Sequence, residues 1–336
     1  MVRSFGFLAA LFLCLLLGGF LSGCAMEDER DLCCEDVTIR FRYSKGDRDL
    51  FPQYITSLRH FLFDADGKLL RTIDDPQSPK QTLRLGQMPE GAYELVSVAN
   101  LADASHLNPT TRRELELLLH KPHTGINAGI DDLQANGDPL YWGAISFESV
   151  RNERHTYLSD LSNIHCRLIV TVRWEGRQPQ GETPFLFVIR GVPQRYSLVR
   201  ERAHAIEVAP FEQALEPFSR GTHLFPYPYS DPGQLVTHAV EAPYLAGRVR
   251  AEFRTLRYTD EVIPYLQIYR SGAPILSKEI HLKEPFRLWK WAVTENIEQV
   301  YEIDLTILED GTVVFNPGGR AKVLDWIDGG TIGMTW

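Results

Sequence analysis

The residues of this 336-residue chain that are best placed for a defined chemical reaction are Leu21-Ser22-Gly23-Cys24, which follow an uncharged, mainly apolar run at 5–19. Arg3 supplies a short positive region before the run, and small residues lead from it into the cysteine. This order is typical of a lipoprotein signal peptide, cleaved between Gly23 and Cys24. The run is also shorter than the roughly 20 apolar residues of a membrane-spanning helix.

We therefore expect residues 1–23 to be removed and Cys24 to become an N-acyl, S-diacylglycerol cysteine. These acyl chains are enough for stable anchoring, so the protein would lie on a membrane without spanning it. The alternative is ordinary secretory cleavage that leaves Cys24 as a plain thiol. Residues 24–35 begin with an acidic, non-periodic stretch, which predicts a solvated tether between the lipid and the folded chain.

Few other residues are spaced for catalysis or metal binding. Asp64-Ala65-Asp66-Gly67 is similar to the start of a calcium loop, but Lys68 stands where an oxygen ligand is needed, so we interpret it as a hairpin turn. His120 and His123 are separated by Pro122, which breaks the helix that would align them, and we interpret both as surface loop histidines. No nucleophile elbow, zinc-protease, phosphate-loop or dinucleotide motif occurs. The sequence therefore predicts no enzyme, no cofactor and no metal site.

Charge and cysteine content narrow the class of protein further. The formal charge is -9, and the only charge in the leader is that of Arg3, so the 313 residues that remain after cleavage carry -9 - 1 = -10. No basic patch dense enough for phosphates is present, which argues against nucleic acid as a partner. Besides Cys24, the processed chain has Cys33, Cys34 and Cys166, an odd number that cannot complete a disulfide framework. We expect Cys166, in an apolar strand, to be a small buried residue.

The elements that must position these residues are mostly strands. Val37, Ile39, Phe41 and Tyr43 alternate with polar residues, a pattern that predicts a half-buried strand. Other expected strands in the first half are 58–63, 82–85, 93–99, 140–147 and 156–161. A short helix is predicted after Asn108-Pro109-Thr110-Thr111, carrying Leu115, Leu118 and Leu119 and ending at Pro122.

A second cycle of the same pattern begins at about Ile164, which predicts two copies of one β-unit. The strands expected there are 167–174, 185–189, 244–255, 264–269, 275–282, 299–308, 312–315 and 322–326. Many short strands with Gly and Pro turns favour antiparallel sandwiches, and 209–235 is expected to be a long loop. We predict a removed leader at 1–23, a tether at 24–35, and β-sandwich domains at 36–162 and 163–336.

The order of these motifs resembles the FimB/Mfa anchoring and accessory lipoproteins of Bacteroidetes fimbriae. The resemblance covers nearly all of the processed chain. It is carried first by the lipobox, which is the cleavage motif Leu21-Ser22-Gly23-Cys24, and by the acidic tether that follows it. The other matching segments are Val37-Thr38-Ile39-Arg40-Phe41-Arg42-Tyr43, Phe63-Asp64-Ala65-Asp66-Gly67-Lys68-Leu69, Met88-Pro89-Glu90-Gly91-Ala92-Tyr93-Glu94-Leu95, Leu140-Tyr141-Trp142-Gly143, Tyr301-Glu302-Ile303-Asp304-Leu305 and Trp326. The adjacent Cys33-Cys34 departs from the single cysteine expected there.

The resemblance implies an all-β fold of two tandem transthyretin-like sandwiches and a structural role at the outer membrane. In this pilus type, stalk subunits lose an N-terminal strand to an arginine-specific protease, and a neighbour donates a strand to the vacated groove. An anchor keeps both its lipid and its first strand, so it would hold the filament to the cell surface and end its growth. The implied partners are the major stalk subunit, accessory subunits and the outer membrane.

Two further expectations concern particular residues of that anchor. We expect Val37 to Tyr43 to stay paired in the first sandwich, so that Arg40 and Arg42 are shielded, whereas Arg30 in the tether would be open to cleavage. We expect the C-terminal segment to contact the lowest stalk subunit, through Thr312, Val313, Val314, Phe315, Trp326 and Trp336. The alternative is that these residues only close the second sandwich.

Three functional classes remain open at this point. The first is a fimbrial anchor, or a tip-associated or other minor subunit. The second is a surface lipoprotein that binds glycan through Trp289, Trp291 and the cluster Phe225, Tyr227 and Tyr229, although such aromatics more often fill cores. The third is a surface hydrolase with a dispersed carboxylate site, which no sequence pattern supports.

Overall fold

The alternating residues at the start of the folded chain form the central strand of a sheet, as their pattern predicts. β1 (Asp36–Arg42) buries Val37, Ile39 and Phe41. It pairs in parallel with β12 (Arg154–Asp160) and antiparallel with β6 (Thr82–Arg84).

The computed structural model describes residues 36–45, 48–75, 79–107, 109–151, 153–176, 178–198, 206–207, 229–230, 235–294, 296, 298–316 and 320–321. The predicted all-β class is confirmed: within these residues the α-helices are only α2 (Phe51–Tyr54) and α3 (Lys283–Leu288).

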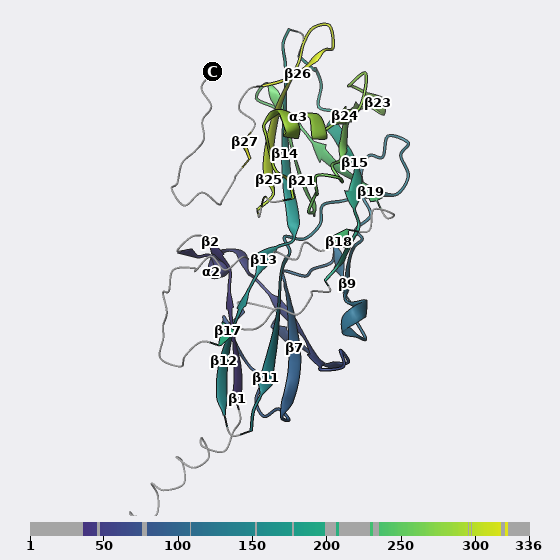
Figure 1. The fold of residues 1–336 in the computed structure, drawn as a ribbon. Coiled ribbons are helices and arrows are strands. Elements are labelled where there is room, and N and C mark those ends of the chain that lie inside the picture. Colours follow the sequence, from purple (N-terminus) through teal and green to yellow (C-terminus); the bar gives the residue numbers. More distant parts are fainter. Residues whose placement is uncertain are drawn as a thin grey trace, which may run out of the picture.

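Two sheets form the first β-sandwich, in the lower half of Figure 1. One sheet has the order β17-β12-β1-β6 and the other β13-β11-β7-β4-β5. The strands not yet located are β4 (Leu58–Asp64), β5 (Leu69–Asp75), β7 (Gly91–Ala99), β11 (Tyr141–Ser149), β13 (Ser162–Asn163) and β17 (Ile206–Glu207), and β2 (Ser44–Lys45) pairs with β3 (Arg48–Asp49) in a small hairpin. Inward residues of both sheets, such as Ile39, Leu95 and Ile145, form one core cluster.

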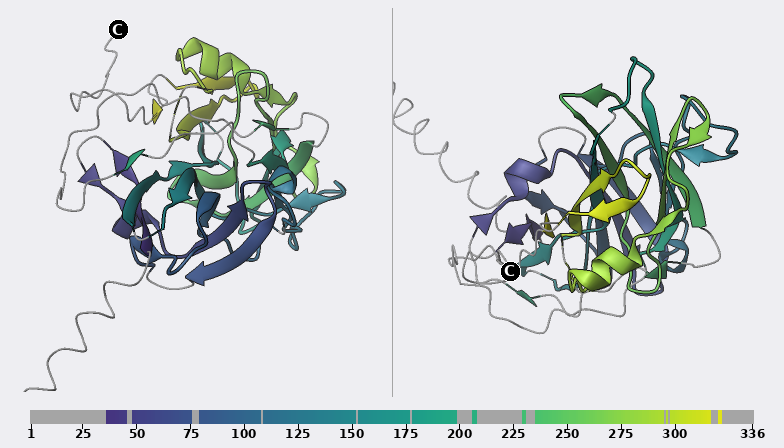
Figure 2. Two further views of the ribbon diagram at one scale, coloured as in Figure 1. Left: turned by 60° about the horizontal axis from the view of Figure 1, so that its bottom comes forward. Right: turned by 90° about the horizontal axis from the view of Figure 1, so that it is seen from above.

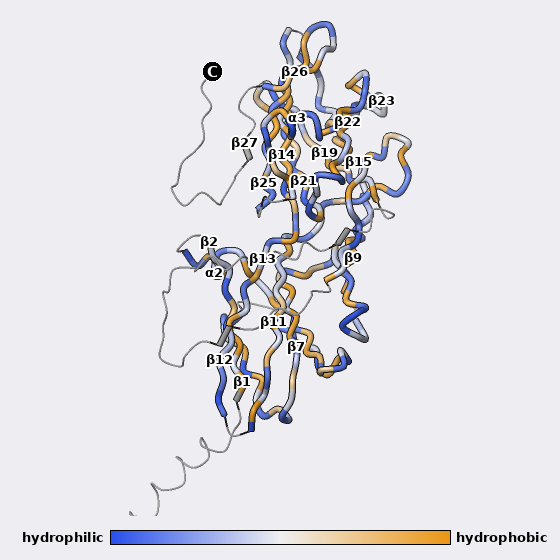
Figure 3. The backbone as a smooth tube through the Cα atoms, in the orientation of Figure 1, coloured by the Kyte–Doolittle hydropathy of each residue, from blue (hydrophilic) through white to orange (hydrophobic). Residues whose placement is uncertain are grey.

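The second β-sandwich lies at the end of the first sandwich that is opposite to the start of β1 (Figure 1). Its sheets have the orders β20-β21-β14-β25-β26, with β27 also paired to β25, and β10-β19-β15-β22-β23, with β24 also paired to β22. Their bounds are β10 (Leu133–Gln134), β14 (His165–Trp174), β15 (Phe185–Pro193), β19 (Leu235–Ala242), β20 (Tyr244–Leu245), β21 (Arg248–Leu256), β22 (Tyr265–Arg270), β23 (Ala273–Pro274), β24 (Ile280–His281), β25 (Val300–Ile307), β26 (Val313–Phe315) and β27 (Arg320–Ala321). Hydrophobic and hydrophilic residues alternate along the strands of both sandwiches (Figure 3).

The two sandwiches repeat one topology. Numbered in chain order, the first has the main strands β1, β4, β5, β6, β7, β11 and β12, and the second has β14, β15, β19, β21, β22, β24 and β25. In both, one sheet has the order 7-1-4, with strand 1 parallel to strand 7 and antiparallel to strand 4. The other sheet has the order 3-2-5-6 in both sandwiches, with every pair antiparallel. The repeat predicted from the sequence is therefore present as a repeated strand order, while the division at residues 162 and 163 stays a prediction.

A segment of the first half crosses over to pack on the second sandwich. β10 pairs in parallel with β19, at the edge of the second sandwich's sheet. Leu133 is buried there against Leu186 and Val188 of β15. Beside it, Asn136 donates from Nδ2 to the backbone oxygen of Glu252 at 2.9 Å. The chain at 121–138 thus covers a face of a domain to which it does not belong in sequence.

In the same way, a segment of the second half of the chain packs on the first sandwich. β16 (Arg195–Ser197) pairs with β9 (Glu116–Leu119), in a small sheet ordered β18-β16-β9-β8 that also holds β8 (Ser105–His106) and β18 (Tyr229–Ser230). Tyr196 and Leu198 are buried in a core cluster with Phe63 and Leu117. Each sandwich is therefore completed by residues from the other half of the chain.

Three sequence expectations about elements are wrong in detail. The helix expected at Leu115, Leu118 and Leu119 is a single 3-10 turn at Arg112–Glu114 followed by strand β9. Leu115, Leu117 and Leu119 point into the core with a period of two, and pairing with β16, which is remote in sequence, decides the conformation. The strand expected at 275–282 is reduced to β24 and leads into α3, and the strand expected at 244–255 is a hairpin of β20 and β21.

Candidate functional site

The two ends of the molecule are the first feature of functional interest. β1 begins at the end of the first sandwich that faces away from the second (Figure 1). Gly23, Cys24 and the tether at 24–35 lie outside the described residues, as do Cys33 and Cys34. No helix in the described part of the chain is both long and apolar enough to cross a membrane. The folded chain therefore starts at one tip of an elongated molecule, and the second sandwich forms the other tip.

The first strand is held in the middle of its sheet. All seven residues of β1 pair with β12, from Asp36 with Arg154 to Arg42 with Asp160, and three of them also pair with β6. The inward side chains, Ile39 among them, are almost completely buried. Loss of this strand would expose that apolar surface, leave β6 without a strand partner and leave β12 paired only with the short strand β17.

Arg40 and Arg42 differ in exposure. The side chain of Arg40 is exposed, whereas Arg42 donates from Nε and Nη2 to the carboxylate of Asp160 at 2.7 and 3.1 Å. Both lie in the paired part of β1. Because a protease binds its substrate as an extended chain with free backbone groups, this pairing would hinder cleavage at either arginine. Arg30 lies outside the described residues.

Strand β26 lies at an edge of the second sandwich that is open as far as the described residues show. β26 pairs only with β25 among the described residues, with Val313 opposite Ile307 and Phe315 opposite Leu305. Val313 and Phe315 pack against the core, while Val314 is 40% exposed. Of the other residues predicted to contact a subunit, Thr312 precedes this strand, and Trp326 and Trp336 lie outside the described residues.

The tryptophans considered for glycan binding are used in packing. Trp289 and Trp291 follow α3, which lies on the outside of the second sandwich next to the C-terminal strands (Figure 2). Their ring centroids are 4.7 Å apart, and Trp291 stacks on Tyr301 at 5.1 Å. Trp289 meets Phe315 of β26 edge-on at 5.9 Å. Leu288, by contrast, is 70% exposed beside them. Phe225 and Tyr227 lie outside the described residues, and so does the Tyr229 side chain.

The motifs that were compared with metal or catalytic sites have ordinary structural roles. The Asp64 carboxylate accepts the backbone N–H groups of Asp66 and Lys68 at 3.1 and 2.9 Å, in a hairpin turn between β4 and β5, as predicted. Gly67 has a φ of 78°, which favours glycine. Among the described residues, no three His, Cys, Asp or Glu side chains gather around a common point that could hold a metal.

The isolated histidines and cysteine are placed as follows. His120 is exposed, but the expectation that His123 is a surface residue is wrong. The His123 side chain is only 11% exposed, with Nε2 3.6 Å from Glu241. The reason is that His123 belongs to the segment at 121–138, which packs on the second sandwich. Cys166 is fully buried, as expected, and burial raises the pKa of its thiol.

A buried polar network joins the two sandwiches, and sequence reasoning did not find it. The Tyr43 hydroxyl donates to the Glu298 carboxylate, and burial, reinforced by that carboxylate, raises the pKa of Tyr43. Asn163 donates from Nδ2 to the backbone oxygen of Glu298 at 2.8 Å. Arg257, only 5% exposed, donates to the backbone oxygens of Asn163 and Asn296 at 3.1 and 2.6 Å.

This network lies where only Ile164 separates β13 from β14. A polar group that is buried and hydrogen-bonded in this way costs stability when it loses its partner, so the junction resists bending or separation. A signal was present in the sequence, since Arg257, Asn296 and Glu298 stand beside apolar strands, but nothing in their spacing brings them together.

The geometry defines a class of protein, namely an elongated all-β protein of two interlocked β-sandwiches. Three solved structures share the fold. A candidate adhesin from Bacteroides ovatus has a TM-score of 0.56 and 17% identity, covering 86% of this chain and 94% of its own. A candidate polysaccharide-binding protein from Bacteroides thetaiotaomicron has a TM-score of 0.55 and 14% identity, covering 85% and 97%. The fimbrial anchor protein Mfa2 from Porphyromonas gingivalis has a TM-score of 0.54 and 16% identity, covering 84% and 95%.

The chain belongs to the family of fimbrillin-A associated anchor proteins Mfa1 and Mfa2, whose model matches residues 30–327. No curated protein matches it. The resemblance stated from the sequence is thus confirmed, and so is a structural role associated with fimbriae at the cell surface.

Proposed function

We propose that this protein is the lipid-anchored base subunit of a fimbrium, held in the outer membrane by acylated Cys24. The lipobox places the lipid at the N-terminus, and β1 begins at the tip of the molecule to which that N-terminus leads. The second sandwich is then directed away from the membrane, toward the major stalk subunit or an accessory subunit. Filament growth ends at this subunit because its own first strand is retained, so its first sandwich offers no vacant position to a donor strand.

The observation that carries this proposal is the central position of β1. A strand paired along its whole length on one side and in part on the other, with an apolar face that is almost fully buried, is an integral part of the core. Removing it would expose several large apolar side chains, each worth about 1.5–3 kcal/mol of burial. We infer from this cost that β1 is retained in the mature protein, which favours an anchor over a subunit that loses its first strand and polymerises.

The N-terminus of the mature protein tests this proposal. We expect mass spectrometry of protein extracted from outer membranes to find an acylated Cys24 followed by the intact tether. The same measurement on an Arg30→Gln variant serves as the control for tether cleavage and should give an identical N-terminus. A free amino terminus after Arg30, Arg40 or Arg42 would instead assign the protein to the polymerising or distal subunits.

The open edge formed by β26 supports a contact with the stalk subunit at the opposite tip. Leu308 donates to the backbone oxygen of Thr312 at 2.8 Å, and Asn316 to that of Asp304 at 2.9 Å. Because hydrogen-bonded pairs alternate along an antiparallel ladder, the backbone N–H and C=O groups of Val313 and Phe315 point away from β25. An added strand could pair with those groups, and the exposed Val314 and Leu288 would meet its apolar side chains.

A proline at position 313 should weaken stalk binding while the second sandwich stays folded. Val313→Pro removes an outward N–H and keeps the groups that pair with β25, so the loss falls on the added strand. One lost hydrogen bond, worth about 0.5–1.5 kcal/mol, predicts a several-fold higher Kd for the purified stalk subunit, measured by biolayer interferometry.

Val314→Thr is the matched control for that variant, because it keeps the β-branched shape and every backbone donor. We expect its affinity for the stalk subunit to change less than that of Val313→Pro, and the melting temperatures of the two variants to be similar. Equal affinity of Val313→Pro and the unaltered protein would show that β26 only closes the second sandwich.

A further inference from the structure

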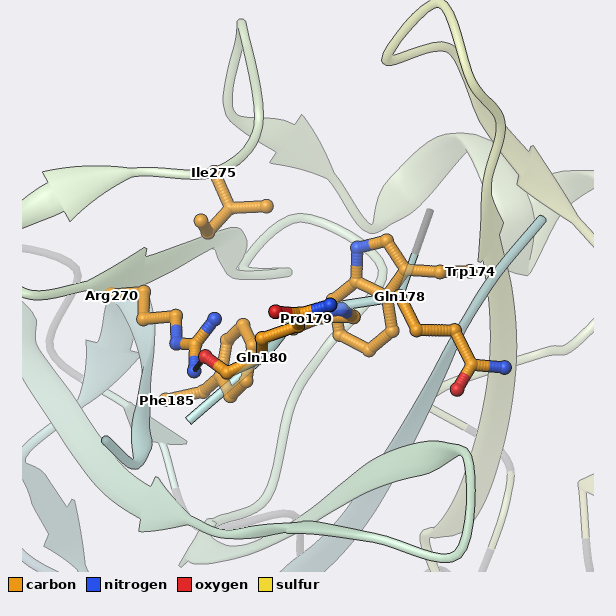
Figure 4. Close-up of a pocket in the computed structure, with 7 residues that line it drawn as sticks. All are labelled: Trp174, Gln178, Pro179, Gln180, Phe185, Arg270 and Ile275. Carbon is orange, nitrogen blue, oxygen red and sulfur yellow. Dashed lines mark hydrogen bonds between the residues drawn. The ribbon is translucent and has the colours of Figure 1, made fainter. Parts of the chain in front are cut away.

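A hollow of about 430 Å³ opens at the tip of the second sandwich that faces away from the first. Trp174 ends β14 and Phe185 begins β15, so the hollow lies between the two sheets, where the loop that connects these strands covers it (Figure 4). Its lining residues are Trp174, Gln178, Pro179, Gln180, Phe185, Arg270 and Ile275. It is separate from the β26 edge and from the Trp289–Trp291 cluster.

One wall of the hollow is a tryptophan ring in a fixed orientation. Trp174 is half-buried, with its ring centroid 5.2 Å from that of Phe185 and 5.8 Å from that of Tyr244, which meets it edge-on. The Tyr244 hydroxyl in turn donates to Oε1 of Gln178 at 2.8 Å. A half-exposed indole held by two other rings gives a flat apolar surface at little entropic cost on binding.

The opposite side carries a positive charge that is fixed in place but not neutralised. The Arg270 guanidinium lies 4.9 Å from the Phe185 ring centroid, which places it over an aromatic face. Its Nη2 donates to the backbone oxygens of Gln180 and Gly181 at 2.5 and 3.1 Å. No acidic side chain in the described part of the chain forms an ion pair with Arg270. Its Nε and Nη1 therefore remain available, and each can donate a single charge-assisted hydrogen bond to a carboxylate.

These features together point to one class of ligand. An indole wall suits the C–H face of a sugar ring, the amides of Gln178 and Gln180 at the rim suit hydroxyl groups, and the volume is of the size that a small ligand occupies. The preformed guanidinium adds a preference for a carboxylate. We propose that this hollow binds a sugar that bears a carboxylate, such as a uronic acid, at the tip of the molecule that faces away from the first sandwich. The proposal does not depend on whether the protein is the anchor.

Methyl β-glucuronide and methyl β-glucoside form the matched pair of probes, because they differ only in the carboxylate at C6. The full-length protein is purified in a detergent without a sugar headgroup, and binding is followed by saturation-transfer NMR titration. One charge-assisted hydrogen bond predicts about tenfold tighter binding of the glucuronide, and that difference should shrink at high salt.

Three variants decide whether this hollow is the site. Arg270→Gln should bind both glycosides equally, and Gln180→Trp, which fills the hollow from an exposed position, should bind neither. Arg248→Gln removes the same charge from an exposed position on β21 and should keep the full preference, and circular dichroism checks that each variant is folded. Equal binding of the two glycosides by the unaltered protein, no binding of either, or a preference that survives Arg270→Gln would each overturn the proposal.

Discussion

Cells in which Cys24 is replaced by serine should release nearly all of their fimbriae into the medium. A serine hydroxyl in place of the Cys24 thiol cannot form the thioether that our proposal assigns to the lipid attachment, so the variant would lack the acyl chains proposed to hold the protein in the outer membrane. Each buried CH₂ of such a chain contributes about 0.8 kcal/mol to membrane binding, and two chains are enough for stable attachment. Immunoblotting of medium and cell fractions for the stalk subunit, with electron microscopy of both, measures the effect.

Cys33→Ser and Cys34→Ser are the matched controls for this experiment. Both remove a thiol at the end of the same tether, but neither cysteine follows a lipobox, so filaments should stay on the cells. Unchanged attachment in the Cys24→Ser strain would reject lipid anchoring by this protein, whatever the folded domains do. Release of fimbriae from all three strains would show that loss of any of these cysteines disturbs export. Release from the Cys24→Ser strain would then no longer support anchoring by lipid.

The second large effect is expected at the junction between the sandwiches. Arg257→Met should lower the free energy of unfolding by about 3–5 kcal/mol, because two buried backbone oxygens, those of Asn163 and Asn296, lose their donors and the network around Glu298 loses a buried cation. Denaturant titration measures the change. Unfolding in denaturant should remain a single transition for the whole protein, since the segment at 121–138 and strand β16 each pack on the other sandwich.

Arg248→Met provides the comparison, since Arg248 is an exposed residue of β21 on the same sandwich. A surface substitution of this kind is expected to change the stability by no more than about 0.5 kcal/mol. Hydrogen exchange should show that Arg257→Met lowers protection in both sandwiches. Lowered protection in the second sandwich alone, with the first unchanged, would mean that the two units are not mechanically coupled through the junction.

The local pattern of the chain predicted much of the fold. Val37, Ile39 and Phe41 alternate with polar residues, and only a half-buried strand satisfies that period. Asp64-Ala65-Asp66-Gly67 predicted a tight turn because Gly67 adopts a positive φ and Asp64 caps its own turn. Errors arose where remote partners decide the conformation, as at Leu115 to Leu119, where pairing with β16 overrides a helical spacing.

The sequence by itself determined the period of the strands and predicted a lipid anchor at Cys24, because strand alternation and a lipoprotein cleavage motif are both properties of neighbouring residues. The tertiary structure alone decided which strands are central and which are edges: β1 pairs with both β12 and β6, whereas β26 pairs, among the described residues, only with β25. It also decided that Trp289 and Trp291 pack inward while Trp174 lines a hollow with Arg270. Contacts between residues that are remote along the chain, such as Arg270 with Gln180 at 90 positions or Tyr43 with Glu298 at 255 positions, depend on how two sandwiches close and stack, and no spacing along the chain encodes that geometry.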